Sequence, residues 1–387
     1  MVKNTHQAKL IYLDYAATTP VDSRVIAAME PYYNKLFYNP SANYQPAQQV
    51  KAALNSARAD VAMTLGVKPS EVIFTAGGTE ANNLAIYGVM SQFPAANLIV
   101  SAIEHESILV PAERYNHKLV PVHQDGTIDV EALAELIDDQ TVMLSIIYAN
   151  NEIGTIQPLQ TISRLISDVR RVRQTKGNKL PLYLHSDACQ AGDYLDLHVA
   201  RLGVDLMSLN GSKIYGPKQS GVLYVSRRAT ILPQILGGGQ EMGYRSGTEN
   251  VTGAIGFSVA LKLAQENCKQ NSYKMKRLQK IFIDEIKRLL PNALINGSMS
   301  HRLPNNVHIT LPGLDNERLL YQLDEKGILA ASGSACSASK QQPSHVLTAL
   351  GCSDSYARSS LRFSMGRYTS SSDILKTVKV LKSLINN

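Results

Sequence analysis

Five short clusters of polar and small residues interrupt the apolar stretches of the sequence, and each could carry chemistry. Residues 75–80 read Thr-Ala-Gly-Gly-Thr-Glu, and residues 210–218 hold Lys213 and Lys218 in a glycine-bounded turn. In residues 75–80 the glycines allow a sharp turn, and the free N–H groups of a helix start favour an anion such as phosphate. In residues 210–218 a desolvated lysine can form a Schiff base with a carbonyl cofactor. A plain turn capped by Thr79, with loop lysines that bind phosphate or water, is the alternative.

Two further clusters contain acid–base groups. His105 lies between two glutamates, and its ordinary pKa near neutrality suits proton transfer, although a surface histidine is the alternative. Asp187, within residues 185–190, follows an apolar run, and a carboxylate there is costly to bury without a partner such as a pyridinium N–H. Gln190 and the amides of residues 150–152 could reach the same ligand. No paired histidine spacing supports a metal.

The fifth cluster is a run of small residues, 332–339, around Cys336. Such a run has little capacity to pack, so the thiol is expected to be exposed and mobile, and therefore reactive. The alternative is a free cysteine in a linker. The small residues around Cys336 favour the interpretation as a reactive thiol.

The elements that position these clusters follow from the hydrophobic pattern. Between residues 70 and 225, short apolar runs alternate with helix-period segments, as is typical of parallel strands joined by helices. Ligands of such a sheet bind at the carboxyl ends of its strands, and four of the clusters directly follow a predicted strand. The strands are expected at residues 72–74, 98–101, 142–148, 182–185, 206–209 and 222–225.

After residue 256 the pattern changes to a long helical stretch, followed by strands at 307–311 and 328–331 and a closing helix from Asp373. We therefore predict an α/β protein with a mostly parallel central sheet in a large domain, residues 15–256. Residues 1–14 and 257–387 are expected to form a smaller α+β domain that carries the cysteine loop, at about 332–343.

Composition excludes several classes of protein. The chain has 387 residues, of which 44% are hydrophobic and 18% charged, so a large folded core is expected. The net charge of +7 is dispersed, so direct nucleic-acid binding is not expected. Four scattered cysteines suit neither a disulfide framework nor a zinc site. No apolar run reaches the roughly 18 residues of a membrane span, so we expect a cytoplasmic protein with reduced thiols.

Taken in order, the five clusters resemble those of the class V aminotransferases, which are pyridoxal-phosphate enzymes of fold type I, and among them the cysteine desulfurases. The similarity runs from residues 12–20, Tyr-Leu-Asp-Tyr-Ala-Ala-Thr-Thr-Pro, to residues 362–367, Arg-Phe-Ser-Met-Gly-Arg. It implies a sulfurtransferase that moves sulfur from L-cysteine to Cys336, leaving alanine and a persulfide.

The resemblance also implies the roles of single residues. Lys213 would carry pyridoxal 5'-phosphate, Asp187 would hold its ring nitrogen protonated, and His105 would stack on the ring and move protons. Arg362 would grip the substrate carboxylate. The remaining implied contacts are Asn151 to the substrate side of the ring, Gln190 to its phenolic oxygen, and Gly78, Thr79 and Ser212 to the phosphate.

The implied partners are a second copy of the chain and sulfur-acceptor proteins. Thr248 resembles the threonine that reaches the phosphate of the neighbouring subunit, which implies a homodimer. The long loop around Cys336 is typical of the first desulfurase group, whose acceptors include iron–sulfur scaffold and tRNA-thiolation proteins. Ser212 stands where many relatives have histidine. Another class V enzyme, an aminotransferase or selenocysteine lyase, and a catalytically silent scaffold remain as alternatives.

Overall fold

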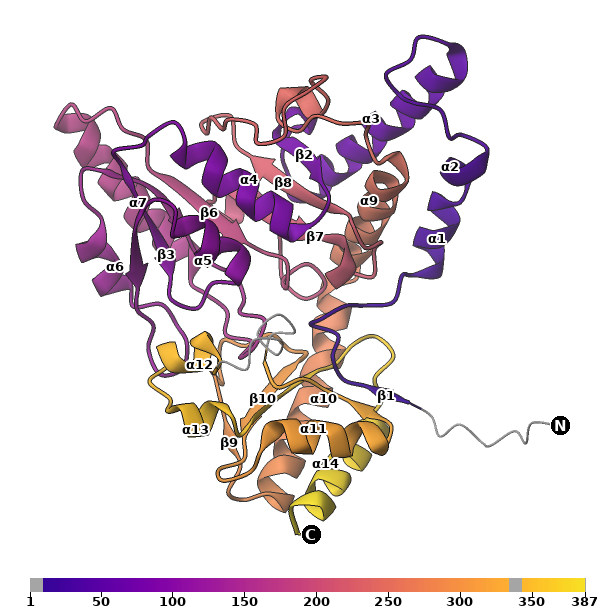
Figure 1. Ribbon diagram of the computed structural model, residues 1–387, viewed down its shortest axis with the longest axis vertical. Coiled ribbons are helices and arrows are strands. Elements are labelled where there is room, and N and C mark those ends of the chain that lie inside the picture. Colours follow the sequence, from indigo (N-terminus) through magenta and orange to yellow (C-terminus); the bar gives the residue numbers. More distant parts are fainter. Residues whose placement is uncertain (1–9, 334–342, 387) are drawn as a thin grey trace.

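A seven-stranded sheet forms the centre of the larger part of the molecule (Figure 1). The computed structural model describes residues 10–333 and 343–386. The strand order is β2-β8-β7-β6-β5-β3-β4; β8 is antiparallel to both neighbours and the other six share one direction. This confirms the predicted, mostly parallel sheet. The strands are β2 (Val72–Thr75), β3 (Asn97–Ser101), β4 (Asn116–Val120), β5 (Thr141–Ser145), β6 (Tyr183–Asp187), β7 (Leu206–Asn210) and β8 (Gly221–Val225).

Strand β4 is absent from the set predicted from sequence. It lies at the edge of the sheet and pairs only with β3. Its sequence is Asn-His-Lys-Leu-Val, and of these side chains only Val120 is buried. An edge strand with little buried surface lacks the apolar run that identifies the central strands.

Helices cover both faces of this sheet because its strands bury both of their faces. In β8, Val222 and Tyr224 belong to the core shared with α3 and α9, whereas Leu223 and Val225 belong to the core shared with α4 and α5. Side chains alternate along a strand, so one strand supplies both cores. The helices are α1 (Ser23–Met29), α2 (Pro31–Asn34), α3 (Gln45–Leu65), α4 (Gly78–Met90), α5 (Glu106–Ala112), α6 (Val130–Leu136), α7 (Leu159–Thr175), α8 (Val199–Leu202) and α9 (Val251–Glu266).

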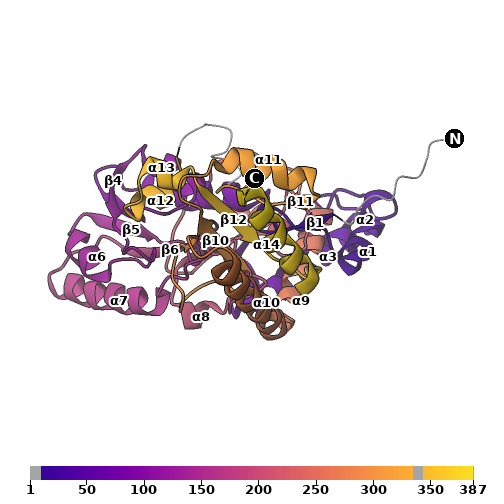
Figure 2. The ribbon, with the colours of Figure 1, turned by 90° about the horizontal axis from the view of Figure 1, so that it is seen from below.

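In the described residues, the smaller part contains a three-stranded antiparallel sheet, a two-stranded pair and five helices (Figures 1 and 2). The strand predicted at 307–311 is confirmed as β10, the central strand of its sheet, but β12, the edge strand that pairs with it, was not predicted. The elements are β1 (Ile11–Tyr12), α10 (Cys268–Leu289), β9 (Leu294–Ile295), β10 (Asn306–Thr310), α11 (Asn316–Glu325), β11 (Ile328–Leu329), α12 (His345–Ala349), α13 (Asp354–Ala357), β12 (Ser360–Ser364) and α14 (Ser371–Asn386).

The long helical stretch after residue 256 consists of two helices that meet at Asn267. Helix α9 packs against α3 in the core of the larger part, where Phe257 and Leu261 are fully buried. Helix α10 instead contributes Met275 and Phe282 to the core of the smaller part. We therefore propose that the domain boundary lies at Asn267 and not at residue 256, which falls inside α9.

Among the described residues, no helix combines the length and apolarity needed to cross a membrane. This finding concerns only helices in the ranges 10–333 and 343–386.

Candidate active site

One cavity of about 250 Å³ gathers most of the side chains that the sequence singled out. It lies at the carboxyl ends of the parallel strands, because most of the contributing loops follow one of these strands. Strand β6 ends at Asp187, and β7 ends three residues before Lys213. The predicted site residues that line the cavity are Gly78, Thr79, His105, Asn151, Asp187, Gln190, Lys213 and Arg362.

One wall of the cavity is the start of α4. Its N-cap is Gly77, at φ 144°, and no side chain caps the helix. The alternative in which Thr79 is the cap is therefore wrong. A side chain on Gly78 is excluded as well, because its Cβ would lie 2.6 Å from Sγ of Cys189. The first N–H groups of α4 thus remain available to an anion, and a phosphate group fits this end of the cavity.

Lys213 ends a short 3₁₀ turn, Gly211–Lys213, that directly follows β7. Its Nζ donates hydrogen bonds to the carbonyl oxygens of Ala16, at 2.9 Å, and Ala17, at 2.5 Å. Burial lowers the pKa of this amine. A lowered pKa increases the fraction of unprotonated amine, the form that attacks a carbonyl. Lys218 is exposed and does not line the cavity, so the structure separates the two lysines that the sequence left open.

Asp187 lies at the floor of the cavity and is 5% exposed. Its Oδ1 accepts the backbone N–H of Cys189 at 2.9 Å, and its Oδ2 accepts Nδ2 of Asn82 at 2.7 Å. The sequence predicted a partner for this buried carboxylate. The structure supplies two, the N–H of Cys189 and Nδ2 of Asn82, and both are uncharged. Because neither donor is a cation, the negative charge of Asp187 can still stabilise a protonated ring nitrogen.

Asn82 connects Asp187 to His105 through one hydroxyl. Its Nδ2 also donates to Oγ of Ser107 at 2.8 Å, and that oxygen lies 2.8 Å from Nδ1 of His105. The backbone N–H of Ser107 donates to the same Nδ1, at 3.1 Å. Since Nδ1 accepts both hydrogen bonds, the proton of the neutral imidazole resides on Nε2. His105, the N-cap of α5, therefore presents a fixed tautomer.

Arg362 enters the cavity from β12 in the smaller part. It is 2% exposed and pairs with Asp14 at 2.7 Å, and its Nη1 donates to the carbonyl oxygen of Asn151 at 3.2 Å. Its Nε is buried without a hydrogen-bond partner among the residues that the structure describes. A carboxylate that enters the cavity would satisfy this donor and gain a charge-assisted hydrogen bond.

Two predicted site residues, Ser212 and Thr248, do not line this cavity, and the position of a third is not described. Ser212 does not line the cavity, since its N–H and hydroxyl both donate to Oδ1 of Asn210, at 3.1 Å. Thr248 lines a separate cavity of about 190 Å³ with Thr75 and Gln219. Cys336 lies outside the described residues.

Sequence reasoning missed several residues that line the cavity, namely Asn82, Ser107, Ile147, Cys189 and Asn210. A signal existed for Asn82, which lies four residues after Gly78 and so on the same face of α4. A signal also existed for Ser107, two residues after His105. Neither could be recognised before the helix starts were located.

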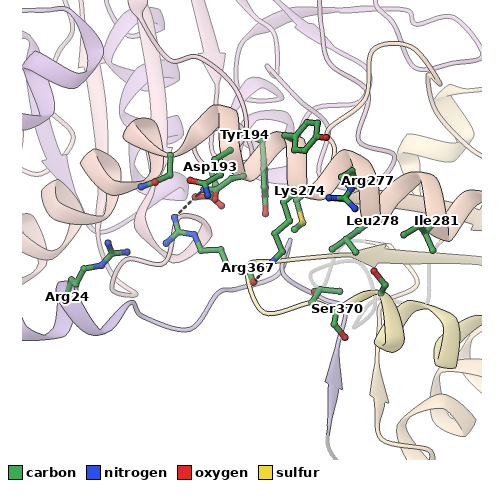
Figure 3. Close-up of a pocket in the computed structure, with 16 residues that line it drawn as sticks. Arg24, Asp193, Tyr194, Lys274, Arg277, Leu278, Ile281, Arg367 and Ser370 are labelled. Carbon is green, nitrogen blue, oxygen red and sulfur yellow. Dashed lines mark hydrogen bonds and ion pairs between the residues drawn. The ribbon is translucent and has the colours of Figure 1, made fainter.

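A larger cleft, of about 790 Å³, lies along α10 (Figure 3). Arg24, Arg367, Lys274 and Arg277 line it, together with Asp193. Two of its cations are already neutralised, because Arg367 pairs with Asp193 and Arg24 pairs with a neighbouring carboxylate. None of the described residues that the sequence predicts for the site lines this cleft, whereas eight of them line the smaller cavity, so we take the smaller cavity as the candidate active site.

The comparisons with known proteins agree with this geometry. The family model of the class V aminotransferases matches residues 11–376. Cysteine desulfurase IscS of Dictyoglomus turgidum is 37% identical over 382 residues, which cover 97% of this chain and 94% of that protein.

Solved structures show the same likeness. A NifS-like protein of Rickettsia africae has a TM-score of 0.87 at 32% identity and is matched over 98% of this chain and all of its own. SspA, solved in complex with cysteine, has a TM-score of 0.79 at 33% identity, over 93% of this chain and all of its own.

The fold and the cavity are those of a class V aminotransferase, and the chain belongs to that family. Within it, the relatives place the chain among the cysteine desulfurases.

Proposed function

We propose that the chain is a pyridoxal-phosphate-dependent cysteine desulfurase that converts L-cysteine to L-alanine and keeps the sulfur as a persulfide on Cys336. The observation that supports this most is the convergence of Lys213, Asp187 and the uncapped start of α4 on one cavity. An amine, a buried carboxylate and an anion site match the aldehyde, the ring nitrogen and the phosphate of this cofactor. When bound, pyridoxal phosphate supplies an electron sink for the bonds of an amino acid.

Three residues of the chain bind the substrate and the cofactor and transfer protons. Arg362 binds the carboxylate of the amino acid, because its planar guanidinium has a donor free and is held by Asp14. Lys213 binds the cofactor through Nζ and, when released, takes or gives a proton at the same atom. His105 offers a proton at Nε2, and the network through Ser107 prevents the imidazole from changing tautomer.

The sulfur step needs a thiolate, which Cys336 supplies. Its sulfur attacks the sulfur of the bound cysteine; an S–S bond forms as the C–S bond breaks, and the carbon that keeps the electron pair takes up a proton. The balance is one L-cysteine and one thiol in, and one L-alanine and one persulfide out. No external oxidant is required.

We further propose a homodimer in which Thr248 serves the cavity of the partner, and acceptor proteins that receive the persulfide sulfur. Thr248 lies outside its own cofactor cavity, which supports this assignment. The resemblance implies acceptors such as an iron–sulfur scaffold or a tRNA-thiolation protein, and the relatives named cysteine desulfurase support a sulfur-donating role.

The test begins with Lys213. Borohydride treatment of the native holoprotein should fix a pyridoxyl group on this side chain, as read by peptide mass. Lys218→Ala should leave the labelling unchanged, and Lys213→Ala should abolish it. A separate sample of holoprotein that has not been treated with borohydride should release alanine at once when incubated with cysteine, and sulfide only after a reductant is added. A holoprotein that is not labelled at Lys213 would refute the proposal.

A further inference from the structure

Tyr215, which lies two positions after Lys213 in the chain, has a strained backbone. Its φ is 62°, in the left-handed region that a bulky side chain rarely adopts. Its side chain is 1% exposed, so the contacts that hold it come from the protein core. A backbone conformation of this kind persists only where the surrounding structure holds it in several ways. The contacts of Tyr215 therefore also fix the backbone next to the lysine.

Thr19 joins Tyr215 to the turn that carries Lys213. Its Oγ1 accepts the backbone N–H of Tyr215 at 2.8 Å and donates to the carbonyl oxygen of Ser212 at 3.0 Å. The N–H of Asp22, in the same stretch of chain, donates to the carbonyl oxygen of Tyr215 at 2.9 Å. This stretch also supplies the carbonyl oxygens that accept Nζ of Lys213. It thus holds the lysine turn on both sides and the amine itself.

Arg367 reaches Tyr215 from the smaller part. Its backbone N–H donates to the phenolic oxygen of Tyr215 at 2.7 Å, and its Cζ lies 4.0 Å from the centre of the ring. The guanidinium is itself held, because it pairs with Asp22 at 3.3 Å and with Asp193 (Figure 3). Both carboxylates belong to the larger part. Tyr215 is thus fixed at its backbone by the larger part, and at its hydroxyl and ring by the smaller part.

We propose that Tyr215 is a positioning residue for Lys213 and that Arg367 holds it in place across the junction of the two parts. This inference rests on the proposed function, in which Lys213 binds the cofactor. Lys213 lines the cavity, whereas Tyr215 and Arg367 do not, so their effect on the chemistry passes through the lysine turn. The bond to the phenolic oxygen keeps the left-handed conformation, and this conformation keeps the turn against the stretch that accepts Nζ.

Tyr215→Phe tests this, because it removes only the oxygen that accepts the N–H of Arg367. The first readout uses the full chain before cofactor is added. Lys213 is labelled with acetic anhydride at a series of pH values, and the product is read by peptide mass. Burial lowers the pKa of this amine in the parent, so a loosened turn that admits water should raise the pKa. We expect a rise of about 0.5 to 1 pH unit, the effect of losing one hydrogen bond.

The second readout is the split between turnover and binding in the holoenzyme. In Tyr215→Phe, kcat for alanine formation should fall about 3- to 10-fold, the factor that corresponds to one lost hydrogen bond. KM for cysteine should stay within about twofold of the parent, because the change removes no contact to the substrate.

Tyr224→Phe is the matched control. Tyr224 is a second buried tyrosine of the larger part, 4% exposed on β8, and it does not line the cavity. This variant should leave both the labelling of Lys213 and kcat unchanged. Arg367→Lys is a second probe: an ammonium group cannot pair with Asp22 and Asp193 and also stack on the ring, so this variant should shift the labelling in the same direction as Tyr215→Phe.

An unchanged labelling pH or an unchanged kcat in Tyr215→Phe, or an equal change in Tyr224→Phe, would overturn the inference. Borohydride labelling of the parent holoprotein separates the two proposals. If the parent is not labelled at Lys213, the proposed function fails, and the anhydride labelling still decides whether Tyr215 positions the lysine. If the parent is labelled and Tyr215→Phe matches it in both readouts, only the positioning role fails.

Discussion

Nδ2 of Asn82 donates a hydrogen bond to Oδ2 of Asp187 at 2.7 Å, and this contact joins helix α4 to β6, the central strand of the sheet. The same nitrogen reaches Ser107 and, through it, His105. One amide therefore orients both the carboxylate and the imidazole of the cavity.

Replacing Asn82 should consequently disturb both groups at once. Asn82→Ala removes one of the two amide donors that hold Asp187, a loss worth about 1 to 3 kcal/mol for a buried polar group. We expect kcat for alanine formation to fall and cofactor dissociation to accelerate. Asn83→Ala, on the next position of α4, is the control, since that side chain donates to backbone carbonyls and not to Asp187. Equal cofactor retention in both variants would contradict this role.

Arg362→Lys should weaken substrate binding without removing the positive charge. A lysine cannot supply donors to Asp14, to the carbonyl of Asn151 and to a substrate carboxylate in one plane. We expect KM for cysteine to rise about 10- to 100-fold, as for the loss of hydrogen bonds to a charged group. Steady-state kinetics measure this. An unchanged KM would place the carboxylate elsewhere.

Cys336→Ala should abolish alanine formation and leave cysteine binding intact. The thiol is needed only after cysteine is bound, so the absorbance change of the cofactor on adding cysteine should persist. Cys268→Ala is the control, because Cys268 begins α10 and does not line the cavity. An aminotransferase or lyase needs no thiol here, so undiminished turnover of Cys336→Ala would favour that alternative.

His185 makes stability depend on pH. It is fully buried on β6 between the hydroxyls of Ser145 and Ser208, and burial lowers its pKa from 6.5 to about 4. Above pH 6.5 the group is neutral in both states. Below pH 6.5 the histidine binds a proton in the unfolded chain but stays neutral in the folded one. The free energy of unfolding therefore decreases as the pH falls, by about 2 kcal/mol between pH 7.5 and 5. It continues to decrease until the pH passes about 4.

Urea unfolding at pH 7.5 and pH 5 checks this dependence. The drop in midpoint between the two pH values should shrink in His185→Gln, although His308, whose pKa burial lowers to about 3, still contributes in the same direction. His117→Gln on the edge strand β4 should retain the drop of the parent. A His185→Gln variant with that same drop would contradict the assignment.

The sequence predicted the central sheet well because its inner strands are apolar on both faces. It failed at β4, whose exposed residues look like a loop, and at β12, whose Arg362 is polar although the strand is buried. Burial of that arginine depends on Asp14, far away in the chain, and pairing across such a distance leaves no local pattern.

The cavity was predictable in part for the same reason. Lys213, His105 and Asp187 follow strand ends, so a parallel sheet must bring them together. Ser212 directly precedes Lys213 but turns toward Asn210, because the geometry of the 3₁₀ turn decides where that hydroxyl points. Spacing alone does not specify such a turn.

The ion pair between Asp14 and Arg362 also orders events during protein synthesis. The ribosome makes the arginine 348 residues after the aspartate. A nascent chain that already contains Lys213 and the sheet therefore still lacks the arginine that we propose binds the substrate carboxylate. Under that proposal, substrate recognition begins only once translation has passed β12.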